Sequence, residues 1–229
     1  MQEIGKSTCT RYSRATSLLW RNQLDIDTGN QLPSDTIDKA VIDVEKIIND
    51  LGECQYLLLN GSIEIFLKSL VGISLEKLRT EKNDISYAMD KRVDGHEIDL
   101  MVFSNGKLEF AVEFKCTLAK DPNASKNQAK KAKEQISKSI EILSSSNPKA
   151  KSCIVHFLIN SRAKEEVSSN PEWIRKRYPN KDPIKASSLE KEYRKTFTGK
   201  TNNIRTITFT SLNRINGIDE ISAVIVDAY

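Results

Sequence analysis

Two carboxylates and an ammonium group lie close together on one predicted β-hairpin. Residues 96–115 form two runs of alternating polar and apolar residues on either side of an Asn-Gly pair, which predicts two antiparallel strands joined by a tight turn. Asp99 lies in the first run, and Glu113 and Lys115 lie in the second. Neighbouring carboxylates repel each other unless a cation lies between them, and hard oxygen ligands suit Mg²⁺. The pattern indicates a divalent-cation site; the alternative is an ordinary polar sheet face with a salt bridge.

Phosphodiester hydrolysis is the reaction that such a set of groups could catalyse. This reaction needs an activated water and stabilisation of the charge that develops on an already anionic phosphate. Bound Mg²⁺ supplies both, because it lowers the pKa of its water and neutralises negative charge. A lysine held close to the metal is placed to position the attacking hydroxide.

The register of the hairpin decides which side chains share a face. The apolar residues of its two strands, which we expect on one face, are Ile98, Leu100, Val102, Leu108, Phe110, Val112 and Phe114. A two-residue turn would place the apolar row of one strand against the polar row of the other. We therefore expect a three-residue loop, Ser104 to Gly106, with Gly106 in the left-handed bulge position. This register pairs Phe103 with Lys107, Ile98 with Val112, Asp99 with Ala111 and Glu97 with Glu113. Asp99, Glu113 and Lys115 then emerge together on the opposite face.

The elements around the hairpin follow from apolar spacing and from helix-breaking residues. Helical spacing predicts a first amphipathic helix from Ser34 to about Leu51, and the apolar segment 55–71 predicts a buried helix whose one acid is Glu64. A short helix follows near 75–79, and another runs from Asp121-Pro122 to about Leu143. Residues 153–159 read as a strand covered on both faces, and two closing strands span 204–210 and 221–226.

The hairpin resembles the PD-(D/E)XK nuclease superfamily, which has the restriction-endonuclease-like fold. The matching residues are Ile98-Asp99, thirteen intervening residues and then Glu113-Phe114-Lys115, within an order of helix, strands, helix and strand from about Gly61 to Asn160. Ile98 stands where the family name has proline. The resemblance implies an α/β fold with a central mixed β-sheet flanked by helices, preceded here by an N-terminal helical region. It divides one nuclease domain into an arm (1–33), N-terminal helices (34–82), a catalytic core (83–160) and a basic insertion with closing strands (161–229).

The resemblance also implies a role for each site residue. Asp99, Glu113 and the backbone carbonyl of Phe114 would bind Mg²⁺, for which Mn²⁺ would substitute. Lys115 would orient or help deprotonate the attacking water. Glu64 would contact the metal through water, with Glu53 as the other candidate for the helix carboxylate. A glutamine near the site would come from the helix after the motif, and Gln135 or Gln128 could fill that role.

The net charge of +4 conceals an uneven distribution along the chain. Up to Lys120 the chain carries 15 basic and 19 acidic residues, and beyond it 20 basic and 12 acidic residues. The basic part suits an anionic partner such as DNA, although unevenly solvated surface is the alternative. The candidate DNA-binding residues are Lys126, Lys130, Lys131 and Lys133 on the predicted helix, and Arg175, Lys176 and Arg177 beside Trp173 and Tyr178. A helix that buries the two aromatic side chains is the alternative for the second group.

Composition and missing motifs exclude several classes of protein. No apolar run is long enough to span a bilayer, so no membrane partner is expected, and the N-terminus lacks a secretion signal, so we expect a cytoplasmic protein. The four cysteines are scattered singly, which argues against a zinc site or disulfides, and the two histidines are too few for a histidine-ligated metal. No phosphate-binding glycine loop is present, so no nucleotide cofactor is expected.

The function expected from these features is Mg²⁺-dependent cleavage of double-stranded DNA. We expect a stand-alone restriction or host-defence endonuclease that acts as a homodimer. A structure-specific repair or recombination nuclease is one alternative. A non-catalytic DNA-binding module that keeps the nuclease fold is the other.

Overall fold

A mixed six-stranded sheet forms the centre of the computed structural model, which describes residues 35–50, 63–81, 85–118, 122–144, 147–160, 184–197, 203–209 and 220–228. The strands are β1 (Ile85–Val93), β2 (His96–Ser104), β3 (Lys107–Leu118), β4 (Lys151–Asn160), β5 (Ile204–Phe209) and β6 (Glu220–Ala228). Their order across the sheet is β1-β2-β3-β4-β6-β5. β3 and β4 are parallel and the other neighbouring pairs are antiparallel, so the predicted α/β class with a mixed sheet is confirmed.

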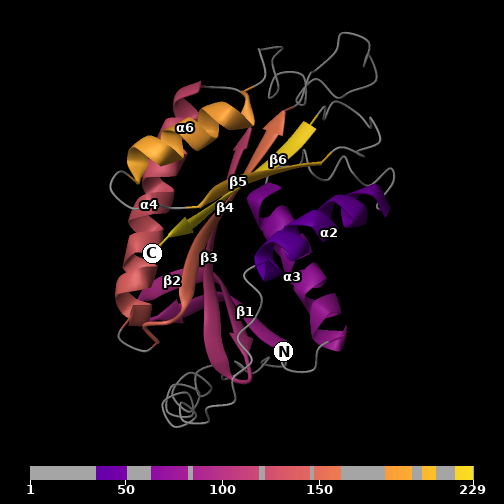
Figure 1. Cartoon of the computed structure of the whole chain (residues 1–229), viewed down its shortest axis with the longest axis vertical. Helices are drawn as coiled ribbons and strands as arrows, with labels where there is room; N and C mark the ends of the chain where they lie inside the picture. The colour runs from indigo at the N-terminus through magenta and orange to yellow at the C-terminus, as the bar shows by residue number, and fades with distance from the viewer. Residues whose placement is uncertain are drawn as a thin grey trace, which may run out of the picture.

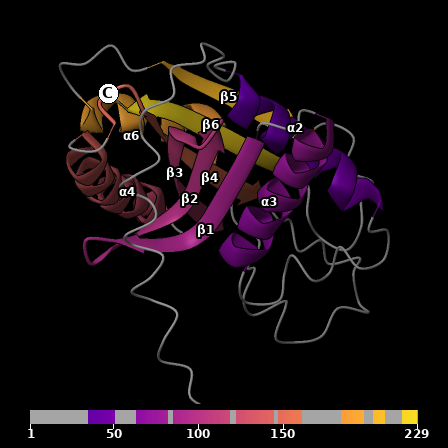
Figure 2. The same cartoon turned by 90° about the horizontal axis from the view of Figure 1, so that it is seen from below.

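Among the described residues, two helices cover each face of the sheet (Figures 1 and 2). α2 (Thr36–Asp50) and α3 (Ile63–Glu81) pack on one face, where Leu67 and Val71 contact a core that includes Val112 and Phe114. α4 (Pro122–Ser144) and α6 (Ala186–Thr196) pack together on the other face around Ile136. Because both faces are covered, β4 is buried along almost its whole length, as its continuous apolar sequence predicts.

Two helix predictions need correction. α3 is one helix from Ile63 to Glu81, so the segment near 75–79 is its last part rather than a separate helix. The helix continues through Gly72 because the missing side chain allows close packing: a Cβ at this position would lie 2.8 Å from Met89 Sδ of β1. The sequence analysis also missed α6, which buries Leu189 and Tyr193 beneath an otherwise polar surface.

The predicted register of the hairpin is wrong. Ser104 pairs with Lys107 across a two-residue turn in which Asn105 and Gly106 both have positive φ, 49° and 73°. A β-bulge reconciles this turn with the apolar pattern, because Val102 pairs with Phe110 and Phe103 with Leu108, which leaves Glu109 as the extra residue of β3. Beyond the bulge, Met101 rather than Asp99 pairs with Ala111, and Leu100 rather than Ile98 pairs with Val112.

The face assignment of the hairpin is right for five of the seven apolar residues. Leu100, Val102, Phe110, Val112 and Phe114 lie in the core beneath α2 and α3. Ile98 and Leu108 lie in a separate cluster with Met101, Phe103 and Leu143 on the other side of the sheet. Leu108 changes side because the bulge separates it from Phe110, and Ile98 changes side at an irregularity described below.

An ion triad joins the N-terminal helix to the far edge of the sheet. The Arg205 guanidinium on β5 donates to both oxygens of Asp38 on α2, at 2.5 Å each, and to Asp227 on β6 at 2.8 Å. We expect Arg205→Met to lower the free energy of unfolding by about 2–3 kcal/mol, because it leaves two partly buried carboxylates without their cation. Urea denaturation of the variant measures this loss.

The control for this prediction is Lys39→Met, which removes an exposed ion pair with Asp35 one helical turn away. Exposed pairs contribute about 0–1 kcal/mol, so the control should unfold close to the wild-type midpoint. Equal losses in the two variants would contradict the account of the triad.

Candidate functional site

The site lies where β2 separates from β3. The paired residues of the two strands end at Leu100 and Val112, and β3 continues for six further residues to Leu118 beside β4. Beyond this point, side chains accept hydrogen bonds from the backbone N–H groups on the edge of β3 that β2 no longer covers. Asp99 Oδ2 accepts the N–H of Phe114 at 2.8 Å, and Glu64 Oε2 accepts the N–H of Cys116 at 2.8 Å. Two carboxylates thus take the place of a neighbouring strand.

A reversal in the strand pattern positions Asp99. Ile98 lies in the cluster with Met101, whereas Leu100 lies in the opposite core, so the alternation of faces is interrupted between Ile98 and Met101. The neighbouring strand has the same interruption opposite it, at Asp90, whose φ is +50°. Asp90 lies between Met89 and Lys91, which pair with Leu100 and Ile98. At this irregular point the carboxylate of Asp99 reaches the backbone of β3.

Lys115 and Glu113 form a buried ion pair beside Asp99. Lys115 Nζ donates to Glu113 Oε1 at 2.6 Å and to the carbonyl oxygen of Phe114 at 2.7 Å. Glu113 is 1% exposed and Lys115 is 7% exposed. Burial raises the pKa of Glu113 to about 7, and the charge of Asp99 acts in the same direction, while Lys115 opposes the shift. Burial also raises the pKa of Glu64, against the charge of Lys115.

Lys68 of α3, one helical turn after Glu64, contacts Asp99 as well. Its Nζ donates to Asp99 Oδ1 at 3.2 Å and to Asp90 Oδ1, and the residue is 8% exposed. Burial acts to lower the pKa of Lys68, but the hydrogen bonds and charges of Asp90 and Asp99 outweigh it and raise the pKa. The sequence analysis missed Lys68. The available signal was its spacing from Glu64, since residues four apart share a helix face.

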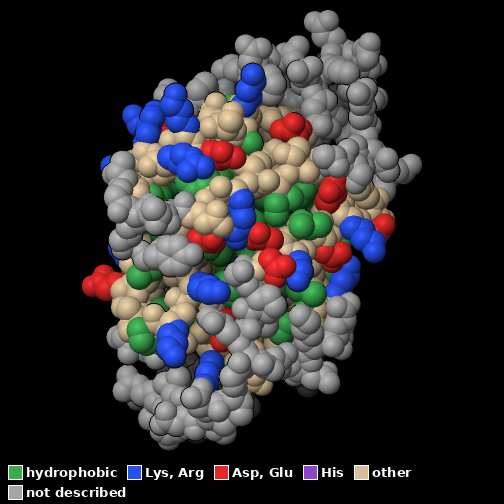
Figure 3. All heavy atoms as spheres, in the orientation of Figure 1, with side chains coloured by type: hydrophobic (Ala, Val, Ile, Leu, Met, Phe, Trp, Pro, Cys, Tyr) green, Lys and Arg blue, Asp and Glu red, His purple; other side chains and the backbone are tan. Residues whose placement is uncertain are grey.

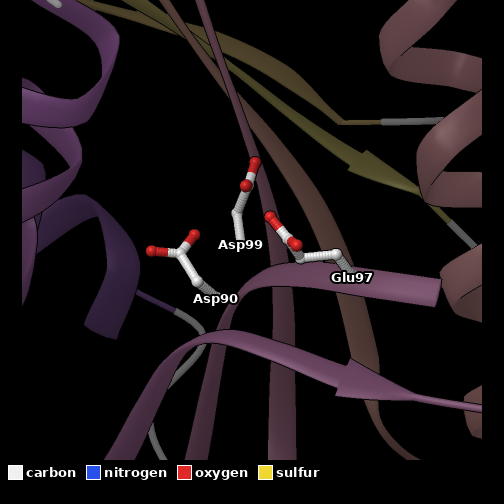
Figure 4. A group of neighbouring side chains, drawn as sticks. All are labelled: Asp90, Glu97 and Asp99. Atoms are coloured by element: carbon white, nitrogen blue, oxygen red, sulfur yellow. The ribbon is translucent and has the colours of Figure 1, made fainter. Parts of the chain in front are cut away.

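One group of three carboxylates among the described residues could hold a metal ion. Oxygen atoms of Asp90, Glu97 and Asp99 all lie within 4.8 Å of one another, and Figure 4 shows these three side chains, which come from the neighbouring strands β1 and β2, gathered together. Asp90 and Glu97 are exposed, whereas Asp99 is partly buried. Glu113 and Glu64, which the sequence analysis placed beside Asp99, do not belong to this group. The carboxylates therefore extend from the exposed Asp90 and Glu97, through Asp99, to the buried Glu113.

The remaining predicted site residues lie on α4 or outside the described residues. Gln135 lies half-buried on α4, and its carbonyl accepts a hydrogen bond from Ser139. Gln128 is also half-buried on α4. Lys126, Lys130 and Lys131 are exposed on this helix, whereas Lys133 donates to the carbonyl of Thr196 and lies over the ring of Phe197. Glu53, Arg175, Lys176 and Arg177 fall outside the described residues.

His156 lies in β4 and contacts residues of β3 and α6. Its ring nitrogens lie 2.7 Å from Thr117 Oγ1 and 2.7 Å from the Tyr193 hydroxyl, and the side chain is fully buried. Burial lowers the pKa of His156 to about 3, with the charge of Lys115 acting in the same direction. The imidazole is therefore neutral, and it fastens β4 to α6 beside the ion pair of Glu113 and Lys115.

Comparison of the chain with protein-family models, curated proteins and solved structures finds no match. In the described part of the chain, no helix combines the length and apolar character that crossing a bilayer requires.

The raised pKa of Glu113 predicts a pH dependence of stability in the metal-free protein. The folded chain holds this proton up to about pH 7, whereas the ordinary value is 4.5. Because the folded state binds the proton more tightly, the free energy of unfolding should fall as pH rises from 4.5 to about 7, and then level off. The decrease should be about 3 kcal/mol at most.

Glu113→Gln should remove this part of the pH dependence. Denaturant titrations of the two proteins with a chelator present, at half-unit steps between pH 4 and about 8, measure the difference. Parallel curves for wild type and variant would show that Glu113 does not carry the shifted proton.

Proposed function

We propose that this chain is a Mg²⁺-dependent DNA endonuclease with a restriction-endonuclease-like core. The observation that carries the proposal is the convergence on one edge of β3. Asp99 and Glu64 accept N–H groups of this edge, and Lys115 bridges Glu113 and the Phe114 carbonyl. The topology agrees, since α3, the β-hairpin, α4 and the parallel strand β4 follow in the order of the resemblance.

The donor atoms suit a hard divalent cation. Asp99, Glu113 and the Phe114 carbonyl offer oxygen ligands of the kind that Mg²⁺ prefers. The ammonium group of Lys115 contacts Glu113 and the Phe114 carbonyl, which supports a preference of these oxygens for positive charge. Burial and, after it, the charge of Asp99 raise the pKa of Glu113, and a cation would relieve the repulsion between the two carboxylates. When bound, the cation lowers the pKa of a water and neutralises charge on the phosphate.

The protein groups have separate tasks in this proposal. Asp99 and Glu113 would hold the cation, and the backbone of β3 fixes the direction of the Phe114 carbonyl. Lys115 would orient the attacking water and support negative charge on the phosphate. Glu64 stays on the Cys116 N–H and keeps the edge of β3 in place.

The surface formed by α4 and α6 supports DNA as the substrate. Lys126, Lys130 and Lys131 are exposed on α4, and Lys191, Arg194 and Lys195 are exposed on α6. The pKa of Glu192 on α6 is lowered first by its hydrogen bond to Lys195 and further by the charges of Lys126 and Lys191, so Lys126 of α4 lies close enough to α6 to act on the same carboxylate. Figure 3 shows Lys and Arg side chains over the α6 region at upper left. Phosphate contacts from such a surface supply affinity without sequence preference.

The burial of Glu113 and Lys115 favours a second candidate, a DNA-binding module without catalytic activity. A phosphate must reach the buried ion pair for cleavage, whereas binding through α4 and α6 does not need this access. Cleavage assays on duplex, branched and single-stranded DNA separate the two functions. Discrete duplex fragments would indicate restriction, preference for branch points would indicate repair, and binding without cleavage would favour the module.

Asp99→Asn and Lys115→Met should each lower the rate of Mg²⁺-dependent plasmid cleavage by about 100-fold or more. The first removes a cation ligand, and the second removes the group that orients the water. Asp94→Asn is the matched control, because Asp94 is exposed in the β1–β2 turn at a φ of 47° that asparagine also adopts. Full cleavage by either site variant would exclude these residues as the catalytic set.

Reversing two charges on α4 should weaken DNA binding in a salt-dependent way. Lys130→Glu combined with Lys131→Glu should reduce the slope of log affinity against log salt by about 2, because two phosphate contacts are lost. Fluorescence anisotropy with a duplex oligonucleotide at several salt concentrations measures the slope.

The control makes the same charge change on the other face of the sheet. Lys39→Glu with Lys46→Glu reverses two exposed lysines of α2. This control should keep the wild-type slope, whereas equal losses in both double variants would show that only total charge matters.

A further inference from the structure

We propose that Lys68 is a positioning residue that sets the affinity of the site for its divalent cation, an inference that rests on the proposed metal-dependent function. The ammonium group of Lys68 holds Asp99 in place and neutralises it while no cation is bound. Asp90 is the second partner that keeps this ammonium paired when Asp99 turns to the cation.

The contacts of Asp99 explain why Lys68 has this role. Asp99 Oδ2 accepts the N–H of Phe114, and Asp99 Oδ1 accepts Lys68 Nζ at 3.2 Å. Both oxygens therefore have partners, and the plane of the carboxylate is fixed by groups from α3 and β3. A cation that binds Asp99 must take Oδ1 from Lys68 or bind beside the ammonium, so in either case it meets this positive charge.

The carboxylates around Lys68 favour a role in which its ammonium group competes with a divalent cation, rather than a role in packing alone. The ammonium lies on the buried side of a group of three carboxylates, Asp90, Glu97 and Asp99, whose oxygens lie within 4.8 Å of one another. The charge of Lys68 also acts on Glu64: burial raises the pKa of Glu64, and the charge of Lys68 is among the effects that oppose this shift. An ammonium at this point reduces the negative potential that attracts a divalent cation.

Asp90 allows Lys68 to remain charged and paired when Asp99 binds the cation. Asp90 faces Asp99 across the β1–β2 pair, and Lys68 contacts an oxygen of each. The positive φ of Asp90 belongs to the irregularity that brings its side chain to this position. Asp90 thus acts on the cation through Lys68.

Mn²⁺ binding to the full-length chain without DNA tests the role of Lys68. Lys68→Met should bind Mn²⁺ about tenfold more tightly than wild type in an electron paramagnetic resonance titration, because a competing charge is gone. The same variant should be less stable than wild type with a chelator present, and Mn²⁺ should restore more of its stability. Lys68→Arg, which keeps the charge, should bind Mn²⁺ within about twofold of wild type.

Lys77→Met on the same helix is the matched control, because Lys77 is exposed and contacts Asp43 of α2. It should leave Mn²⁺ affinity unchanged. If the methionine variant at position 68 does not fold, Lys68→Gln provides the same test with a neutral side chain that keeps an N–H donor. Unchanged or weaker Mn²⁺ binding in the neutral variants would overturn the proposal.

A double-variant experiment tests the role of Asp90. Asp90→Asn alone should weaken Mn²⁺ binding about threefold or more, because Lys68 then depends on Asp99 alone. In the Lys68→Met background the same substitution should have no effect. Equal weakening in both backgrounds would make Asp90 a direct ligand and overturn its proposed action through Lys68.

The experiment separates failure of this inference from failure of the proposed function. Tight Mn²⁺ binding and cleavage by wild type, with no gain in Lys68→Met, would overturn the role of Lys68 and leave the nuclease proposal standing. Binding by Lys68→Met but not by wild type would support the role of Lys68 and contradict a working metal site in the natural chain. Absence of binding in both proteins would overturn both proposals.

Discussion

The hydrogen bond from the Phe114 N–H to Asp99 is the interaction on which the site depends. β3 extends beyond the last residue that pairs with β2, so its next N–H groups have no partner in β2. A buried backbone N–H without a partner is costly. Asp99 supplies the missing acceptor from β2, and Glu64 does the same for the Cys116 N–H from α3. The fold therefore requires hydrogen-bond acceptors at this edge, and the carboxylates that supply them lie beside Glu113 and Lys115. In this way the end of strand pairing and the position of the site have one cause.

Charge balance is the second constraint on this region. Asp99, Glu113 and Glu64 lie at least partly out of water, where an ion without a partner is expensive. Lys115 neutralises Glu113 and Lys68 neutralises Asp99, and these two ammonium groups come from β3 and α3. These lysines balance the charge of the two carboxylates from within the chain. Their positions also mean that a divalent cation would enter by competing with lysines, so stability and cation binding depend on the same contacts.

Local periodicity predicted the elements well, whereas tertiary contacts decided the details. Alternation in 96–115 predicted the hairpin, but the bulge at Glu109 changed its register, because a two-residue Asn-Gly turn with one extra residue satisfies the same apolar pattern. The prediction that Asp99 and Glu113 share a face assumed regular alternation, whereas the alternation is interrupted between Ile98 and Met101 and Asp99 reaches the edge of β3 at that point. Lys68 and Asp90 were missed because their approach to Asp99 depends on how α3 packs on β1 and on the positive φ of Asp90. α6 was missed because just Leu189 and Tyr193 of its polar sequence are buried.

The central claim is that the edge of β3 holds a divalent cation between Asp99 and Glu113. The most direct measurement is a crystal structure of the full chain with Mn²⁺, in which anomalous scattering locates the ion. The account predicts one peak contacted by carboxylate oxygens of Asp99 and Glu113 and by the carbonyl of Phe114, with Lys115 Nζ moved away from Glu113. A peak held by Asp90 and Glu97 without Glu113, or no peak near Asp99 at saturating Mn²⁺, would contradict it.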